Sequence, residues 1–312
     1  MQGGTVVKPL TGIEMDAPSD AAVIKPIGTK GTRGIVLSNG INPEYGKRDA
    51  YRMTMAILDE AVRNAVAVGA NPERIAVLDN FCWGDPLRAE TMGSLVESAR
   101  GCHDAALLFQ TPFISGKDSL NNEYLGADGQ RHAIPPTLLI SVIGIIEDVG
   151  SAVTMDLKEV GNSIYLVGHF APVFGGSHFS MVTKDINEQV PDLHSDAPKV
   201  YKALHNAITS KLVRSAHDIS EGGLAVAAAE MCIGGRIGMK VETDAKDIVR
   251  FLFGETTNSL LVEVRKQDED AFIKNFANLP CMKIGEVTQT QTLSVSEFNV
   301  AIDDLVVAWN KQ

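Results

Sequence analysis

The chain has 312 residues, of which 45% are hydrophobic and 21% charged, and its formal net charge is −11. This length suffices for two domains with full cores, and the acidic balance argues against nucleic acid or an anionic membrane as the main partner. Because the four cysteines are widely spaced, no apolar run reaches a membrane span and no signal-peptide pattern opens the chain, we expect a cytoplasmic protein with reduced thiols.

Glycine, proline and small residues dominate residues 1–19, which we interpret as a lead-in segment without a compact element. Such a start favours a chain that is a piece of a longer or divided polypeptide. Short strands are predicted over residues 20–25 and 34–38. Apolar residues at three- and four-residue steps then predict a helix over 49–68, which Gly69 ends.

Two segments each place glycine and polar residues directly after a short apolar run. Residues 79–86 follow a strand predicted over 75–78, and residues 115–119 follow Phe113 and Ile114. We predict both apolar runs as buried strands and both polar segments as loops. In an open α/β sheet, ligands lie beyond the carboxyl ends of strands, where glycine admits a phosphate and an acid can hold a metal. Two ordinary turns are the alternative.

Between the two loops the pattern predicts a helix over residues 89–109. The residues expected on its buried face are Met92, Leu95, Val96, Ala99, Cys102 and Ala106. Residues 121–136 carry an Asp-Gly pair and two prolines, and we predict them as an exposed excursion. A long apolar strand follows over 138–146.

The character of the sequence changes near residue 155, and the predicted domains are residues 20–154 and 155–312. Strands and helices alternate beyond this boundary. The predicted strands are 163–167, 239–242, 259–264 and 283–287, and the predicted helices are 199–212 and 224–233. Alternation of this kind predicts an α/β or α+β layered fold.

A candidate metal site comes from residue spacing. Glu60 and Asn64 are four residues apart on the first predicted helix, so their side chains lie on one face, one turn apart. Two oxygen ligands at that spacing suit Mg²⁺, which usually takes few protein ligands and keeps waters or phosphates. Asp218 and Ser220 precede a glycine pair at a helix start and add a carboxylate and a hydroxyl. The alternative is a solvated helix face with a helix cap at Ser220.

A known family is identified by four features that occur in order: residues 79–86, residues 115–119, the segment His217–Gly223 and the turn Phe253-Gly254-Glu255. Over essentially residues 20–312, the chain resembles the carboxyl-terminal half of the phosphoribosylformylglycinamidine synthase family. The resemblance implies an AIR synthetase-like α/β (α+β) half with two domains. The amino-terminal domain would contribute strands to a central β-barrel shared with a homologous half, and the carboxyl-terminal domain would be an α/β sandwich.

The resemblance also implies an activity, the ATP-dependent conversion of formylglycinamide ribonucleotide to its amidine in purine biosynthesis. The expected partners are the amino-terminal half of the synthetase, a glutaminase subunit that supplies ammonia, and a small bridging subunit. The family's catalytic histidines lie in the first half and match nothing in this chain. We therefore expect no catalytic residue here, and an isolated chain that is inactive and forms a homodimer.

Residue by residue, the resemblance implies two sites. The first consists of nucleotide contacts at Asp79, Gly116 and Lys117 and a substrate contact at Ser119. Relatives place a Mg²⁺-binding asparagine where this chain has Lys117, so Lys117 would contact phosphate and any metal would move to Asp118. The second is an auxiliary nucleotide site with Mg²⁺. Its implied metal ligands are Asp20, Glu60, Asn64 and Asp218, with a nucleotide contact at Ser220.

Two other functions stay open at this point. One is a non-catalytic module that binds nucleotide and stabilises the barrel. The other is a stand-alone homodimer like aminoimidazole ribonucleotide synthetase or selenophosphate synthetase. Selenophosphate synthetase expects a reactive cysteine or selenocysteine near the amino terminus, whereas the first cysteine here is Cys82. The glycine-rich amino-terminal signature expected of the cyclo-ligase is also missing.

Overall fold

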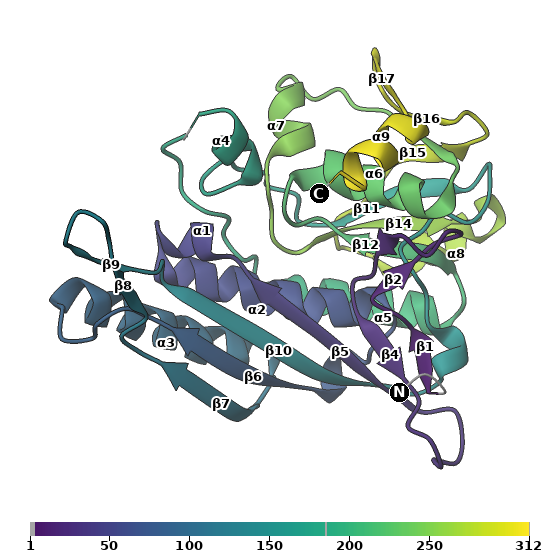
Figure 1. The fold of residues 1–312 in the computed structure, drawn as a ribbon. Coiled ribbons are helices and arrows are strands. Elements are labelled where there is room, and N and C mark those ends of the chain that lie inside the picture. Colours follow the sequence, from purple (N-terminus) through teal and green to yellow (C-terminus); the bar gives the residue numbers. More distant parts are fainter. Residues whose placement is uncertain (1–3, 185, 312) are drawn as a thin grey trace.

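The computed structural model describes residues 4–184 and 186–311, and its first half is built on a six-stranded sheet (Figure 1). In sheet order the strands are β1 (Thr5–Val7), β4 (Ala22–Ile24), β5 (Gly34–Ile41), β10 (Thr137–Ile146), β6 (Ile75–Cys82) and β7 (Phe113–Ser119). Neighbouring strands are antiparallel except β6 and β7, which are parallel. Within the described residues this sheet stays open and closes no barrel.

Two long helices, α2 (Ala50–Ala67) and α3 (Ala89–Phe109), lie on one side of this sheet (Figure 1). The side chain of Asp49 caps α2 by accepting the Arg52 N–H at 2.9 Å. Beyond its end Gly69 adopts φ 110°, a conformation that glycine takes without strain. The helix predicted over 49–68 is confirmed.

The buried face of α3 differs from the prediction. Met92 and Val96 are 43% and 49% exposed, and Ala99 is exposed as well. The residues that α3 buries are Ser98, Gly101, Ala105 and Phe109. Small residues let α3 approach α2 closely, and the Ser98 hydroxyl lies 2.7 Å from that of Thr54. The buried face of α3 is therefore determined more by small side chains, which permit close helix packing, than by hydrophobicity.

Short elements complete the first half. They are β2 (Leu10–Thr11), β3 (Ala17–Pro18), α1 (Pro43–Gly46), β8 (Glu123–Leu125) and β9 (Arg131–Ala133). The β8–β9 hairpin projects from the molecule, as predicted for an exposed excursion, and Leu125 is 71% exposed (Figure 1).

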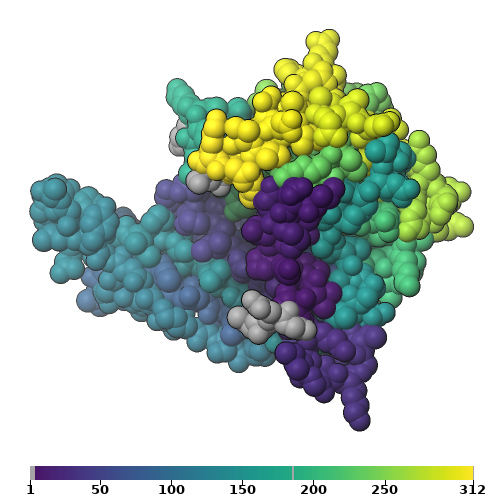
Figure 2. Space-filling view, turned by 45° about the vertical axis from the view of Figure 1, so that its right-hand side comes forward, coloured from purple at the N-terminus to yellow at the C-terminus, as the bar shows by residue number. Residues whose placement is uncertain are grey.

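The amino-terminal segment differs from the prediction. Where the sequence predicted no compact element before Asp20, the structure has three strands, β1, β2 and β3. Figure 2 shows this purple segment against the yellow carboxyl-terminal part, where Trp309 Nε1 donates to the Asp16 carbonyl at 2.7 Å.

The second half is built on a seven-stranded sheet with helices on both faces (Figure 1). In sheet order the strands are β12 (Val213–Asp218), β14 (Ser259–Val264), β11 (Ser163–Gly168), β15 (Cys281–Thr288), β13 (Gly238–Val241), β16 (Thr292–Val295) and β17 (Phe298–Ala301). The helices are α4 (His178–Val182), α5 (Ala197–Thr209), α6 (Gly223–Gly235), α7 (Ile248–Phe253), α8 (Glu269–Asn275) and α9 (Ile302–Trp309). The predicted mixed α/β class is confirmed.

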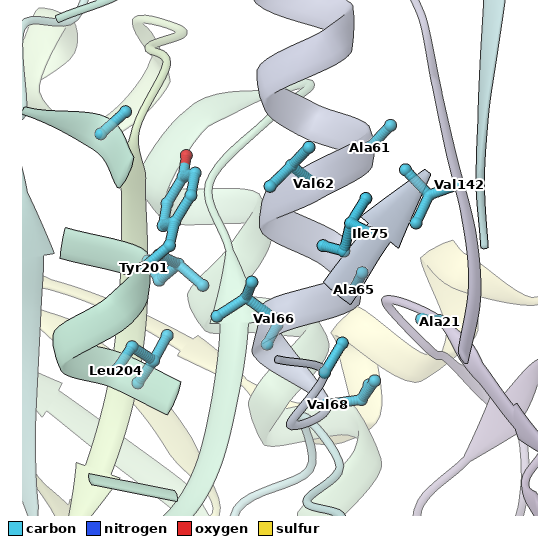
Figure 3. Close-up of a cluster of buried hydrophobic side chains, with 14 of the residues drawn as sticks. Ala21, Ala61, Val62, Ala65, Val66, Val68, Ile75, Val142, Tyr201 and Leu204 are labelled. Atoms are coloured by element: carbon cyan, nitrogen blue, oxygen red, sulfur yellow. The ribbon is translucent and has the colours of Figure 1, made fainter. Parts of the chain in front are cut away.

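One hydrophobic core joins the two halves, because α2 packs against the first sheet on one side and against α5 of the second half on the other. Figure 3 shows Val62 and Val66 of α2 beside Tyr201 and Leu204 of α5, with Ile75 of β6 on the other side of the helix. This packing fixes the rotation of α2, so that its polar residues face Tyr201, Asp218 and Asn258 of the second half. No helix among the described residues is both long and apolar enough to cross a membrane.

Candidate nucleotide and metal site

Residues from both halves line a cavity of about 470 Å³. The lining residues are Pro18, Ser19, Asp20, Asn39, Glu60, Asn64, His178, His217, Asp218, Ser220, Glu221, Gly222, Val226 and Glu230. All four implied metal ligands and Ser220 are among them, although they come from three distant parts of the chain. Five of the lining side chains are carboxylic acids and none is lysine or arginine. We call this space the acidic cavity.

Asp20 joins the two halves at the floor of the acidic cavity, where its side chain is fully buried. Its Oδ1 accepts the backbone N–H of Asp218 at 2.9 Å and lies 3.0 Å from His217 Nδ1. Its other oxygen, Oδ2, is buried without a hydrogen-bond partner among the described residues. A buried carboxylate oxygen that lacks a donor is costly unless a cation or water contacts it.

Helix α2 contributes the predicted pair of oxygen ligands. Asn64 donates through Nδ2 to the Asn39 carbonyl at 3.4 Å, while its Oδ1 is a second buried oxygen without a partner in the described chain. Glu60 Oε2 accepts the Ile41 N–H at 3.2 Å. Burial, followed by the charges of Glu221 and Asp218, raises the pKa of Glu60 well above its ordinary value. A cation beside these oxygens would reverse that shift.

Asp218 is held in place by Arg63, which the sequence analysis did not single out. Arg63 is 1% exposed and lies between two carboxylates, Asp59 at 2.5 Å and Asp218 at 3.2 Å. Tyr201 of α5 donates its hydroxyl to Asp59, and the Asn258 N–H donates to the same carboxylate at 2.9 Å. Arg63 thus positions Asp218 at the cavity wall from beneath.

The loop between β12 and α6 brings Ser220 and Glu221 to the cavity. Helix α6 is capped by Gly222, whose φ of 79° is in the left-handed region, and no side chain caps it. The alternative of a helix cap at Ser220 is therefore wrong. The Gly222 N–H donates instead to Glu255 Oε1 at 2.9 Å.

Two histidines face the acidic cavity, and both have carboxylate partners. His217 lies 3.0 Å from Asp20 and 2.8 Å from Glu230, so both ring nitrogens are engaged. Burial opposes the charge of this imidazole, but the two carboxylates outweigh it and raise the pKa of His217 well above its ordinary value. A hydrogen bond from His178 to the Glu255 carboxylate, at 3.2 Å, likewise raises the pKa of His178.

The donor set of the acidic cavity fits Mg²⁺. Among the described residues, Asp20 Oδ2 and Asn64 Oδ1 have no hydrogen-bond partner, and the carboxylates of Glu60 and Asp218 line the same space. Hard oxygen ligands of this kind, few in number and close to open volume, are what Mg²⁺ prefers when it also binds phosphates. The lining residues include no lysine or arginine, so negatively charged phosphates would need Mg²⁺ to offset the charge of the carboxylates.

The other four candidate residues lie on neighbouring strands rather than loops. The prediction of two loops needs correcting: β7 runs to Ser119, so residues 115–119 are strand, and β6 runs to Cys82, so only residues 83–86 of the predicted loop 79–86 lie outside a strand. The prediction that Phe113 and Ile114 start a buried strand is also wrong, because β7 is an edge strand and Ile114 is 59% exposed. A run of only two apolar residues does not distinguish a buried strand from an edge strand.

The parallel register places Asp79 opposite Gly116 and Asn80 opposite Lys117. A Cβ on Gly116 would lie 1.9 Å from Asp79 Oδ1, so these two positions share one face of the sheet. Since side chains alternate along a strand, Lys117 and Ser119 project from the opposite face. Burial, followed by the charge of Asp118, raises the pKa of Asp79. The four candidates are neighbours in the sheet but are divided between its two faces.

Several residues of the acidic cavity had escaped the sequence analysis. They are Ser19, Asn39, His178, Glu221 and Glu230, with Arg63 behind them. Glu221 follows Ser220 directly, and Arg63 precedes Asn64, so adjacency to predicted ligands was an available signal. For His178 and Glu230 the sequence offers no such signal, because only the tertiary fold brings them to this wall.

Family comparison identifies this architecture. The AIR synthase related protein, N-terminal domain, matches residues 18–146, and the AIR synthase related protein, C-terminal domain, matches residues 159–297. The chain belongs to the AIR synthase related proteins. A curated relative, phosphoribosylformylglycinamidine synthase subunit PurL of Thermoplasma volcanium, is 33% identical over 98% of this chain and 40% of its own length. The chain thus spans less than half of that relative.

Solved structures give the same fold. The chain aligns with Thermotoga maritima PurL complexed with FGAR at a TM-score of 0.73 and 14% identity, over 96% of this chain and 49% of that one. The T. maritima PurL complexed with ADP gives a TM-score of 0.71 at 16% identity, over 95% of this chain and 47% of the other. At this identity the likeness establishes the fold alone. The resemblance to the phosphoribosylformylglycinamidine synthase family is confirmed.

Proposed function

We propose that this chain is one half of an ATP-dependent formylglycinamide ribonucleotide amidotransferase of purine biosynthesis, with a Mg²⁺-nucleotide in the acidic cavity. The observation that carries the proposal is the convergence of Asp20, Glu60, Asn64 and Asp218 on one cavity, two of them with unpartnered buried oxygens. The PurL relatives, and the ADP-bound PurL of the same fold, support a nucleotide as the ligand.

In the proposed reaction, ATP phosphorylates the amide oxygen of the ribonucleotide, and ammonia displaces that oxygen as phosphate to give the amidine and ADP. In the acidic cavity, which we propose as the auxiliary nucleotide site, a bound Mg²⁺ would neutralise charge on the nucleotide phosphates and the surrounding carboxylates. Asp20, Glu60, Asn64 and Asp218 would hold it, and Ser220 would donate its hydroxyl to a phosphate. The FGAR-bound PurL supports the substrate class, for which Ser119 remains a proposed contact.

The proposal assigns the chemistry to the assembly rather than to this chain alone. The chain spans 40% of its curated PurL relative, which supports a second half as a partner. We propose that the glutaminase and bridging subunits complete the enzyme and supply ammonia. A non-catalytic nucleotide-binding half stays the competing function. Addition of the complementary half distinguishes the two, because ammonia-dependent ATP hydrolysis appears only if this chain contributes to the reaction.

Nucleotide binding is tested by thermal unfolding with and without Mg²⁺ and ADP. A ligand that binds only the folded state stabilises it by about 2.7 kcal/mol at one hundred times its dissociation constant. Glu60→Gln keeps an acceptor for the Ile41 N–H but removes the charge, so it should abolish most of the Mg²⁺-dependent shift. Asp79→Asn is the matched control and should leave the shift intact. If only Asp79→Asn loses the shift, the nucleotide is bound at β6 and β7 and the proposal for the acidic cavity fails.

A further inference from the structure

A second cluster of metal-ligating side chains lies outside the acidic cavity, at the junction of β11 and α5. His169 follows the last residue of β11, and His194 and Asp196 immediately precede α5. One ligand atom from each of the three residues lies within 4.8 Å of the other two. The imidazole rings of His169 and His194 stack with their centroids 3.3 Å apart. Nothing in the proposed amidotransferase uses these three residues.

The distances in this cluster leave room for a bridging atom. Asp196 Oδ2 lies 3.8 Å from His169 Nε2 and 3.8 Å from His194 Nδ1, which is too far for direct hydrogen bonds. Two ligands of a tetrahedral zinc ion, each about 2.1 Å from the metal, lie about 3.4 Å apart. The observed separations are closer to that value than to a hydrogen bond.

Hydrogen bonds leave two ligand atoms of the cluster available and engage the third. Lys199 Nζ occupies Asp196 Oδ1 at 2.6 Å, so the other carboxylate oxygen faces the two imidazoles. His169 Nε2 is buried and has no hydrogen-bond partner in the described part of the chain. The Asp196 N–H donates to His194 Nδ1 at 3.2 Å, so this nitrogen carries the lone pair and must give up that hydrogen bond when the ring turns toward an ion.

We propose that His169, His194 and Asp196 bind a transition-metal ion of the zinc class, with water in its fourth position. Two imidazoles and one carboxylate are a donor set that suits zinc, whereas Mg²⁺ and Ca²⁺ favour sites made of oxygen alone. Burial, followed by the charge of His194, lowers the pKa of His169 and keeps its imidazole in the neutral form that ligates metals. Because the rings stack face to face, the half-exposed His194 ring must turn toward the shared ion.

The ion would connect the end of β11 to the start of α5 and close the loop between them. That loop contains α4, and its residue His178 lines the acidic cavity. A crosslink that closes a long loop lowers the entropy of the unfolded chain and stabilises the folded one. The site is therefore structural in this proposal, and it stands whether or not the acidic cavity binds nucleotide.

The test uses the purified chain, freed of metal by a chelator and titrated with Zn²⁺ and, separately, with Co²⁺. We expect one more bound ion per chain than in the variants His169→Gln and His194→Gln, a visible Co²⁺ absorption of four-coordinate type, and a higher thermal midpoint with Zn²⁺. Both variants should lose that ion, its absorption and the rise in midpoint. Both histidines are partly exposed, so neither substitution threatens folding.

His132→Gln is the matched control, because His132 also pairs with an aspartate, Asp128 at 2.9 Å, and stacks on a ring, that of Tyr124. This variant should bind and respond as the unaltered chain does. An unaltered chain with no Co²⁺ absorption would overturn the proposal, and so would metal binding that survives both cluster substitutions. The second result would place the ion elsewhere, for example among the carboxylates of the acidic cavity.

Discussion

Arg63 Nη2 lies 3.2 Å from Asp218 Oδ2, although 155 residues separate the two in the sequence. The guanidinium belongs to α2 of the first half and the carboxylate to the end of β12 in the second. Both are buried, and Asp59 lies on the other side of the same guanidinium. This contact links the packing of the two halves to the geometry of the acidic cavity.

Replacing Arg63 should destabilise the chain strongly. Arg63→Met leaves Asp59 and Asp218 buried without their cation, and breaking a buried pair in this way costs about 3–5 kcal/mol. Urea unfolding measures the loss. Arg100→Met is the matched control, since Arg100 pairs with Glu97 on the exposed side of α3 and should change stability by only about 0.5 kcal/mol. Equal effects of the two substitutions would contradict the role given to Arg63.

The Glu188–Arg250 pair should make stability depend on acid pH. The guanidinium holds both carboxylate oxygens, at 2.7 and 2.9 Å, and with the Phe174 N–H it lowers the pKa of Glu188 to about 2. A pKa below the unfolded value stabilises the fold above that value, and the stabilisation disappears as pH falls from about 4.5 to about 2. The thermal midpoint of Glu188→Gln should therefore lie below that of the unaltered chain at about pH 5, with a smaller gap at about pH 3.

Glu97→Gln serves as the comparison for this pH series, because the Glu97–Arg100 pair is exposed on α3. Its midpoint should follow that of the unaltered chain throughout. A gap for Glu188→Gln that stays constant or widens toward acid pH would show that the ion pair does not account for the stability difference.

Gly116 and Asp79 should be coupled energetically. Alanine at position 116 would bring its Cβ to 1.9 Å from Asp79 Oδ1, so the partly exposed carboxylate must turn to another rotamer, which costs about 1 kcal/mol. In the background of Asp79→Ala the obstacle is gone, and the same glycine substitution should be nearly neutral. A double-mutant cycle by urea unfolding measures the coupling. If the free-energy changes of the two substitutions are additive, the absence of a Cβ at Gly116 is not needed to accommodate the Asp79 side chain.

The open face of the first sheet should cause self-association. Leu37 and Ile41 of β5 are 42% and 38% exposed, and their cross-strand partners on β10 are Ile143 and Leu139. An exposed apolar face of this kind favours pairing, most often two-fold. Sedimentation at tens of micromolar should give a dimer, and Leu37→Lys should shift it toward monomer. Val307→Lys, at an exposed apolar residue on α9, should leave the dimer intact; a monomeric unaltered chain would refute the prediction.

Sequence patterns predicted local geometry well wherever one element decides it. The step from Glu60 to Asn64 is one helical turn, so their shared face follows from the helix itself, and both line the acidic cavity. The strand predicted over 138–146 is confirmed as β10, because a long apolar run rich in isoleucine and valine favours a strand. The family motifs further predicted that Asp20 and Asp218 would accompany the helix residues, and the fold brings them together.

What the sequence by itself determined is thus the longest helices and strands, the mixed α/β class and the candidate oxygen ligands that a motif or a helical turn holds together. Tertiary structure alone decided which strand forms the edge, which stripe of α3 is buried, and on which faces Asp79 and Lys117 lie. It also decided that Arg63 supports Asp218 and that His169 meets His194. The physical reason is that periodicity reports only the faces of one element, whereas register, edges and buried ion pairs depend on contacts between distant segments.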